Sequence, residues 1–296
     1  MHHSHPLITQ LLARGPVLAD GAWGTQLQEL GLQPGECPDA WNLLHPDRVE
    51  QVARAYVEAG SQVILTNTFR ANRLALAPYG LAGQTVAINR AGVEISRRAA
   101  AGRALVFASI GPSGRMLLTG ETTEEDLAAA FAEQARAQAE AGADAIVVET
   151  MADLTEARLA VIAALDTGLP VVASMVFDSG RHKDRTMMGV TPEQAARELS
   201  AVGAHVIGAN CGQGVAGYVE ICRRLRAATE RPIWIKANAG LPDVVEGKAV
   251  YRTTPEEYAS YVPALLEAGA SFLGGCCGAT PEFIRAMARV LRAAQR

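Results

Sequence analysis

Four segments of the chain repeat one pattern, in which a helix end is followed by a glycine and then by a short apolar run. The segments are EAGSQVILTNT, EAGADAIVVET, AVGAHVIGANC and EAGASFLGGCC. Glycine adopts the left-handed conformation that stops a helix, and a short β-branched run is typical of a parallel strand covered on both faces. Further apolar runs occur in PVLADG, ALVFASIGP, PVVASMVF and PIWIKANAG. The pattern therefore predicts about eight strands that alternate with helices.

The segments between these runs have the spacing of amphipathic helices, as in PDRVEQVARAYVEAG and TEEDLAAAFAEQARAQAEAG, and Thr191, Pro192 and Glu193 predict a helix start. Alternating βα units without a glycine-rich dinucleotide fingerprint favour a (β/α)8 TIM barrel over an open sheet. We expect a single barrel domain over residues 1–296, in which residues 1–12 form an N-terminal extension or a first helix. The polar segment 178–189 is either an active-site loop or a solvated loop.

Composition and charge narrow the class of partner. The chain has 296 residues, a formal net charge of −4 and a pI near 5.9, so no basic surface for nucleic acid is expected. Five cysteines do not make a disulfide scaffold in a chain of this length. The N-terminal residues lack the regions of a signal peptide, and no apolar run has membrane-spanning length. We expect a cytoplasmic protein that acts on small molecules and binds neither nucleic acid nor membrane.

The barrel prediction also indicates where a site lies, because βα loops at the carboxyl ends of the strands build the active-site face of this fold. Polar or thiol side chains occur at most of these predicted strand ends. They are Asp20, Asn67, Glu149, Cys211, Asn238, Cys276 and Cys277. Cysteines that are distant in sequence are therefore expected to meet at one mouth.

Cys276 and Cys277 are adjacent in GGCCGATP, and Cys211 lies in GANCG. Neighbouring side chains of a regular strand point to opposite faces, so only a bent, glycine-flanked backbone brings both to one place. Three thiolates form a zinc site with a fourth position open to water or substrate, the pattern of catalytic zinc. The alternatives are buried core cysteines or a redox pair. Cys37 and Cys222 lack the strand-end context and are predicted to be bystanders.

Each of three other candidate residues, Glu149, Asn238 and Asp20, has two possible roles. Glu149 follows a strongly apolar strand, so it is expected to meet a cation or a substrate ammonium, or else an internal arginine. Asn238 either binds a ligand with ammonium and carboxylate groups or is a turn residue. Asp20 either caps the DGAWGT turn or orients a polar group of the ligand, and the backbone N–H groups of that turn can receive a carboxylate. His205 is predicted to be a core or supporting residue, and His2, His3 and His5 are left out of the site.

Together these motifs resemble the homocysteine S-methyltransferase family across nearly the whole chain. The matching segments are DGAWGTQLQELGL, WNLLHPDRV, ILTNTFRANRLALAPYGL, SIGPSG, VVETMADLTEA, IGANCGQG, KANAGLP and GGCCGATPEFI. The resemblance implies a TIM barrel in which Cys211, Cys276 and Cys277 are catalytic and bind zinc (Zn2+), with the homocysteine sulfur in the open position. The predicted substrate-binding residues are Asp20, Ala22, Trp23, Gly24, Thr25, Asn67, Glu149 and Asn238. Of these, Glu149 and Asn238 are implied to contact the amino-acid end of homocysteine, and the DGAWGT backbone its carboxylate.

The implied activity is zinc-dependent methyl transfer to the homocysteine thiolate, which forms methionine. GTQLQELG and NAGLP look closer to the homocysteine module of cobalamin-dependent methionine synthase and its reductase-fused relatives than to users of S-methylmethionine. The donor stays open between S-methylmethionine, a betaine-like onium compound, and methylfolate or methylcobalamin with a corrinoid or folate protein partner. A partner is included because we expect no folate or cobalamin module after the barrel. Trp23 replaces a frequent methionine, and Ala237 a usual proline. The rival readings are transfer to another thiol or selenol and a non-catalytic zinc or thiol sensor.

Overall fold

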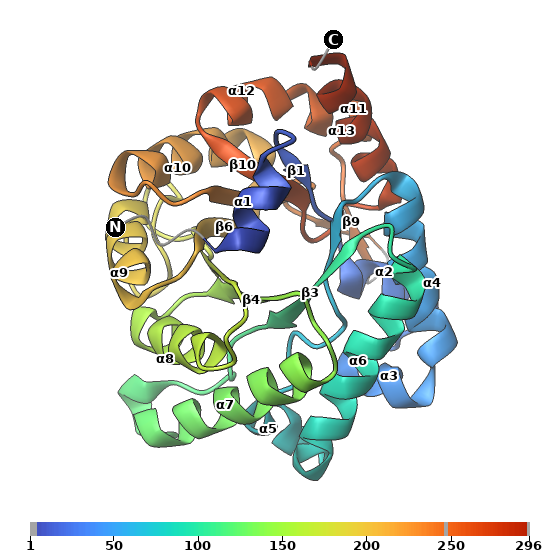
Figure 1. Ribbon diagram of the computed structural model, residues 1–296, viewed down its shortest axis with the longest axis vertical. Coiled ribbons are helices and arrows are strands. Elements are labelled where there is room, and N and C mark those ends of the chain that lie inside the picture. The colour runs from blue at the N-terminus through green and yellow to red at the C-terminus, as the bar shows by residue number, and fades with distance from the viewer. Residues whose placement is uncertain (1–4, 246–247, 295–296) are drawn as a thin grey trace.

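The eight predicted strands form one parallel sheet that curls into a barrel. The computed structural model describes residues 5–245 and 248–294, and within them the strand order is β1-β10-β7-β6-β5-β4-β3-β2. The strands are β1 (Val17–Leu18), β2 (Val63–Ile64), β3 (Leu105–Ile110), β4 (Ala145–Met151), β5 (Val171–Met175), β6 (Val206–Gly214), β7 (Ile233–Asn238) and β10 (Ala270–Gly275). The order begins with β1 and ends with β2, so the two edges of the sheet come together and the TIM-barrel prediction is confirmed (Figure 1).

Helices surround the barrel (Figure 1). They are α1 (Pro6–Leu12), α2 (Trp23–Glu29), α3 (Trp41–Leu44), α4 (Pro46–Ala59), α5 (Arg73–Leu76), α6 (Thr85–Ala100), α7 (Glu124–Glu140), α8 (Leu154–Leu165), α9 (Pro192–Val202), α10 (Val215–Ala228), α11 (Pro255–Ser260), α12 (Val262–Glu267) and α13 (Pro281–Ala294), with 3-10 turns η1 (Pro38–Ala40), η2 (Ala77–Tyr79), η3 (Ala82–Gln84) and η4 (Leu117–Thr119). The glycine stops of the repeated pattern have positive φ, for example 107° at Gly60 and 114° at Gly203. The predicted start of α9 is also confirmed, because the Thr191 side chain accepts a hydrogen bond from the Gln194 N–H.

Side chains take part in joining β1 to β2. The Gln62 N–H donates to the Leu18 carbonyl (2.7 Å), and Gln62 Oε1 accepts from the Leu18 N–H (3.0 Å). Further along, Asp20 Oδ2 accepts from the Leu65 N–H at 2.7 Å. The barrel is therefore closed at this junction partly by polar side chains, and one of them is a predicted site residue.

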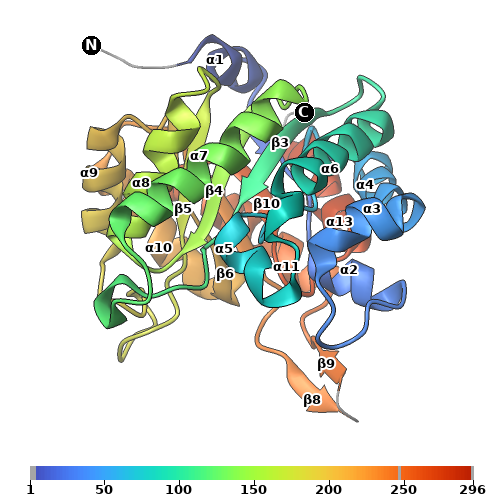
Figure 2. The same cartoon turned by 90° about the horizontal axis from the view of Figure 1, so that it is seen from below.

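Helix α1 covers the end of the barrel at which the strands begin (Figure 2). Ile8 is 2% exposed and packs in the cluster that fills the barrel interior with Phe107, Trp234 and Phe272. His5, which the sequence pattern assigned no role, caps α1 by accepting from the Leu7 N–H at 3.2 Å. Residues 6–12 are thus a helix that closes the barrel, while His2 and His3 lie outside the described residues.

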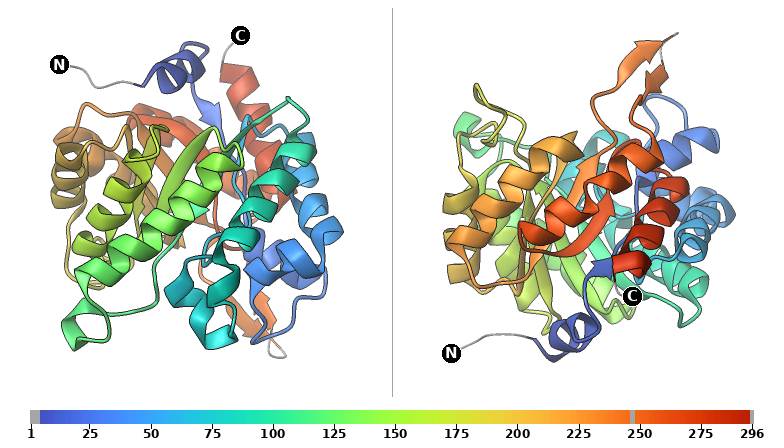
Figure 3. Two further views of the ribbon diagram at one scale, coloured as in Figure 1. Left: turned by 60° about the horizontal axis from the view of Figure 1, so that its bottom comes forward. Right: turned by 90° about the horizontal axis from the view of Figure 1, so that it is seen from above.

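A two-stranded antiparallel hairpin, β8 (Asp243–Val245) with β9 (Lys248–Val250), lies at the other end of the barrel and was not predicted from the sequence. Figures 2 and 3 show it projecting away from the body on the side opposite α1. Among the helices that the structure describes, none combines the length and apolar character needed to cross a membrane.

Candidate active site

The three cysteines predicted to converge lie together at the carboxyl end of the barrel. Cys211 belongs to β6, and Cys276 and Cys277 follow β10 directly. Their sulfur atoms all lie within 4.8 Å of one another, and the Sγ atoms of Cys211 and Cys277 are 3.9 Å apart. All three are free cysteines of intermediate exposure, so a ligand can reach them. Cys37 and Cys222 are buried elsewhere, Cys37 before η1 and Cys222 on α10.

Irregular backbone on both strands accounts for this convergence. At Cys211 the chain has φ of +65°, and the register between β6 and β7 shifts between Cys211 and Gly214. Left-handed backbone at a non-glycine residue is strained by about 1–3 kcal/mol and redirects the side chain out of the regular alternation. After β10, the Ala279 N–H donates to the Cys276 carbonyl (3.0 Å), and Gly278 follows the cysteines with φ of +79°. The bend that the glycine-flanked sequence predicted is therefore present.

The donor set fits a zinc ion. Thiolates at about 2.3 Å from a tetrahedral zinc lie about 3.8 Å from each other, close to the 3.9 Å between Cys211 and Cys277. Three protein ligands leave one tetrahedral position open, as in catalytic sites. Cys211, Cys276 and Cys277 are the residues that would hold the metal.

Without a metal the thiols favour their protonated forms. Hydrogen bonding to Cys276 lowers the pKa of Cys211, but hydrogen bonding to Cys277 and burial outweigh it and raise that pKa to about 12. The pKa of Cys277 is also raised to about 12, because hydrogen bonding to Cys276 and burial outweigh the lowering by Cys211. Hydrogen bonding to Cys211, together with burial, raises the pKa of Cys276 as well. A cation bound here would therefore displace protons.

A cavity of about 300 Å³ opens beside the thiols. Most of the predicted substrate-binding residues line it. The lining residues are Gly21, Ala22, Trp23, Gly24, Thr25, Pro38, Asp39, Leu65, Thr66, Asn67, Phe69, Arg70, Ser109, Glu149, Thr150, Cys211, Lys236, Cys276 and Cys277. The Asn67 amide lies on this wall and donates to the Pro38 carbonyl at 2.8 Å. The cavity thus joins a thiol cluster to carboxylates and aromatic rings.

Glu149 is a buried carboxylate in this cavity. Its Oε1 accepts from the Ser109 hydroxyl at 2.5 Å, and its Oε2 accepts from Asn210 Nδ2 at 3.3 Å. Burial raises the pKa of Glu149, and the nearby charge of Lys236 partly opposes this. Sequence reasoning kept an internal arginine as the alternative partner of Glu149, whereas the cation that acts on its pKa is Lys236. One carboxylate oxygen has only a long hydrogen bond, so a ligand ammonium would find an acceptor there.

Asp20 is fully buried and engaged within the protein. Lys236 Nζ lies 2.5 Å from Asp20 Oδ1, and Asp20 Oδ2 accepts from Trp23 Nε1 (2.7 Å) and from the Leu65 N–H. These contacts are not the cap of the DGAWGT turn that was one of its two interpretations, since the start of α2 has no side-chain cap: Asp20 instead orients the Trp23 side chain and joins strands. It is not among the residues that line the cavity.

Two other predicted residues have hydrogen-bonding groups that are already used within the protein. The Ala22 N–H donates to the Ala279 carbonyl at 2.9 Å, so this group of the DGAWGT turn is already used. The Asn238 side chain donates to the Gly212 carbonyl at 3.0 Å and does not line the cavity, although its buried Oδ1 has no hydrogen-bond partner among the described residues. Asn238 therefore supports the bend after Cys211. Ala22 still lines the cavity, together with Trp23, Gly24 and Thr25 at the start of α2.

Several residues of the site were not identified from the sequence, among them Lys236, Asp39 and Tyr251. Lys236 interrupts the apolar strand IWIKAN, and the argument applied to Glu149 would have identified it. Asp39 lines the cavity, and burial raises its pKa to about 6. Tyr251 follows the unpredicted hairpin and packs so closely over Gly278 that a Cβ there would lie 2.3 Å from its ring. Tyr251 could not be placed from the sequence, because the hydrophobic pattern does not show the hairpin that precedes it.

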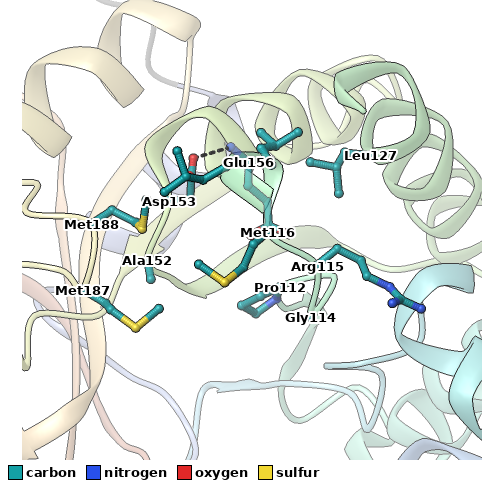
Figure 4. A pocket seen from close by; sticks show the side chains of 12 residues that line it. Pro112, Gly114, Arg115, Met116, Leu127, Ala152, Asp153, Glu156, Met187 and Met188 are labelled. Carbon is teal, nitrogen blue, oxygen red and sulfur yellow. Dashed lines mark hydrogen bonds between the residues drawn. The ribbon is translucent and has the colours of Figure 1, made fainter. Parts of the chain in front are cut away.

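A second cavity of similar volume lies on the same face, between the loops after β3, β4 and β5. Figure 4 shows its methionine-rich wall, with Met116 from the first loop and Met187 and Met188 from the segment 178–189. Met187 is 67% exposed and Leu118, also on this wall, 80% exposed. Glu156 accepts from the Ser113 N–H at 2.8 Å. The segment 178–189 thus borders this neighbouring cavity and not the thiol cavity.

Barrel and site define a class of protein: a (β/α)8 enzyme with three thiols at the mouth that can hold a catalytic metal. Comparison with known proteins specifies the family. The sequence profile described as homocysteine S-methyltransferase matches residues 17–291, and the methionine synthases of Mycobacterium leprae and Mycobacterium tuberculosis are each 31% identical to this chain over 300 residues. The chain belongs to the homocysteine S-methyltransferase family, as the sequence motifs predicted.

The extent of these matches differs between relatives. The two mycobacterial alignments cover 95% of this chain but 25% of each relative, so the chain spans about a quarter of their length. Among solved structures, the homocysteine methyltransferase MmuM of Escherichia coli matches in its oxidized form with a TM-score of 0.80 and 22% identity, over 96% of this chain and 99% of that one. Its metallated form matches with a TM-score of 0.79 and 24% identity, over 95% and 99%. The structural likeness establishes the shared barrel.

Proposed function

We propose that the protein transfers a methyl group to the thiol of homocysteine, forming methionine, with zinc held by Cys211, Cys276 and Cys277. The observation that carries the proposal is the cluster of three sulfur atoms within 4.8 Å, at the mouth of a barrel of this family. A MmuM structure in a metallated form supports a metal in such a barrel. Zinc bound here would act as a Lewis acid that favours the thiolate form of the substrate.

The residues of this chain bind and orient the acceptor. Glu149 offers a carboxylate to the ammonium group of homocysteine, and the backbone at the start of α2, at Trp23 to Thr25, lies where its carboxylate can be received. The half-buried rings of Trp23 and Phe69 cover the cavity and limit water. A bond forms between the homocysteine sulfur and the methyl carbon while the bond from that carbon to the donor breaks. The thiol proton leaves to solvent when the acceptor binds, so we assign no general base.

The donor is either a small onium compound or a methyl group carried by a corrinoid or folate protein. Carboxylates and aromatic rings in the cavity suit a compact cation such as S-methylmethionine or betaine. The exposed apolar side chains around the same face, among them Leu118, Met187 and Leu241, favour a protein-borne donor.

The experiment that tests the proposal is methionine formation from homocysteine by the reduced, zinc-loaded protein with S-methylmethionine, betaine, methylfolate and methylcobalamin as donors. Turnover with one donor supports the reaction and identifies the donor class. Turnover with another thiol or a selenol in place of homocysteine, but not with homocysteine, would instead support a different acceptor. Absence of any turnover together with zinc-dependent binding of a protein would favour a sensor.

A further inference from the structure

Lys236 is a buried lysine that the proposed reaction does not use directly. Its side chain is 3% exposed, it extends from β7 into the barrel, and it borders the thiol cavity. Burying an ammonium group costs several kcal/mol unless a partner compensates it. The partner is Asp20, which follows β1, and its Oδ1 lies 2.5 Å from Lys236 Nζ. The ammonium also lies 5.7 Å from the centre of the Trp234 ring.

Asp20 connects Lys236 to the wall of the cavity, because it also binds Trp23. One of its oxygens meets Lys236, and the other accepts from the Trp23 indole N–H and the Leu65 N–H, both at 2.7 Å. Asp20 is itself fully buried, so its position is fixed by these three donors on β7, α2 and the segment after β2. The indole N–H has its acceptor at the back of the cavity, and the indole therefore cannot turn without losing that hydrogen bond.

Trp23 is placed where its orientation affects what enters. It is half-buried, packs against both the interior cluster of the barrel and the outer core cluster, and borders the cavity beside Cys276 and Cys277. An indole is one of the largest side chains, and the cavity has a volume of only about 300 Å³. A small change in the angle of this ring therefore changes the space left beside the thiols.

We propose that Lys236 is a positioning residue that acts through Asp20 to hold the Trp23 indole as a fixed wall of the thiol cavity, and that this wall selects the thiol acceptor by shape. The selection concerns the carbon chain between the sulfur and the amino-acid end of the acceptor, which lies along the indole. This inference rests on the proposed function for its substrate, but the Lys236–Asp20–Trp23 contacts exist independently of any turnover.

The first test observes the indole without requiring activity. The protein is labelled with 5-fluorotryptophan, and the 19F resonance of Trp23 is assigned as the one missing from Trp23→Phe. We expect Lys236→Met to shift or broaden the Trp23 resonance and to leave that of Trp41 in place, whereas Lys183→Met, at an exposed loop lysine, changes neither. If Lys236→Met does not fold by circular dichroism, Lys236→Arg keeps the charge but displaces the contact and is expected to move the same resonance. An unmoved Trp23 resonance in a folded Lys236 variant would overturn the proposal.

The second test measures selectivity as the ratio of kcat/KM for homocysteine to that for cysteine, which lacks one methylene. We expect Lys236→Met and Trp23→Phe each to lower this ratio by about 10-fold, in the range by which pocket shape discriminates one methylene. The double variant should show no further loss, because both changes act through one indole. Ratios that multiply in the double variant, or a change in kcat alone, would mean that Lys236 acts otherwise. If no donor supports turnover, the proposed function fails while the fluorine experiment still decides the positioning role.

Discussion

Each thiol at the barrel mouth depends on a local backbone feature, and that of Cys211 is the clearest. Its left-handed φ and the register shift after it aim the sulfur at Cys277. We predict that Cys211→Ser loses stoichiometric zinc and methyl transfer, because serine is a poor ligand for zinc. Cys222→Ser, at a buried cysteine on α10, should keep both. Zinc content by elemental analysis after dialysis checks this, and equal occupancy in the two variants would refute the assigned site.

The raised pKa values of the thiols make zinc binding dependent on pH. Cys211 and Cys277 have pKa values near 12, so they are protonated at neutral pH in the metal-free protein and must lose their protons to bind as thiolates. We therefore expect zinc affinity to rise with pH and up to three protons to be released per zinc from the cluster. Calorimetry in buffers of different ionisation enthalpy measures the number released. No proton release at neutral pH would show that the thiols are already ionised.

Glu149 is expected to contribute mainly to acceptor binding. Glu149→Gln keeps the shape and removes the charge, so the KM for homocysteine should rise about 10- to 100-fold, as for loss of a hydrogen bond to a charged group. The matched control is Glu156→Gln, which changes a buried carboxylate bordering the neighbouring cavity. Steady-state kinetics with varied homocysteine distinguishes the two, and an equal effect of both substitutions would argue against a specific contact.

The sequence predicted the site residues unequally, for a physical reason. The cysteines and Glu149 were identifiable because each lies at a strand end, and the barrel topology alone brings strand ends together. Lys236 and Asp20 pair across 216 positions of sequence, and the partner of a buried charge depends on side-chain directions that no periodicity encodes. The same limit applies to Asn238, whose type suited a ligand contact but whose amide donates to Gly212.

Among the elements, the segment 178–189 is held to the barrel by Arg224 of α10. Arg224 pairs with Asp184 in that segment (2.7 Å) and with Glu193 of α9 (2.5 Å). Hydrogen bonding to Arg224 lowers the pKa of Glu193 to about 2. A carboxylate with a lowered folded-state pKa adds stability that is fully present above its unfolded pKa and is lost as pH falls toward the folded value.

We predict that Arg224→Met lowers the free energy of unfolding at neutral pH by about 1 kcal/mol, a value discounted because the pair is partly exposed to solvent. The difference from the unchanged protein should shrink between about pH 5 and pH 2, as Glu193 becomes protonated. Urea unfolding across this range measures it. Arg223→Met, which removes a more exposed pair with Glu220 on the same helix, is expected to have a smaller effect at every pH. A pH-independent difference would exclude Glu193 as the titrating partner.

The hydrophobic pattern predicted strands more accurately where both faces of the strand are buried. Strands such as β4 and β5 begin with buried apolar runs shortly after a glycine or proline residue, and these runs mark the strands in the sequence. The hairpin of β8 and β9 was not predicted because each strand has only three residues, which is too short for a hydrophobic pattern to mark a strand.

At the scale of the whole molecule, one end of the barrel holds the thiol cluster and the other end is closed by a helix that contributes to stability. Ile8 of α1 fills the end away from the thiols. We predict that Ile8→Ala lowers the free energy of unfolding by about 2–5 kcal/mol, as for other large-to-small core substitutions, while zinc binding is retained. Gln10→Ala, at an exposed position of the same helix, should be nearly neutral. Denaturant unfolding and zinc titration of both variants check this, and loss of zinc in Ile8→Ala would show that the two ends are coupled.

The location of α1 also has a practical consequence. The helix covers the end of the barrel opposite the hairpin, as Figure 3 shows from two directions, whereas the cysteines lie at the carboxyl ends of β6 and β10. A biotin attached to an exposed residue of α1, such as Gln10, would immobilise the protein on a sensor chip with its thiol cavity turned toward the flowing solution. Donors of any size, from an amino acid to a whole protein, could then be compared on one oriented surface.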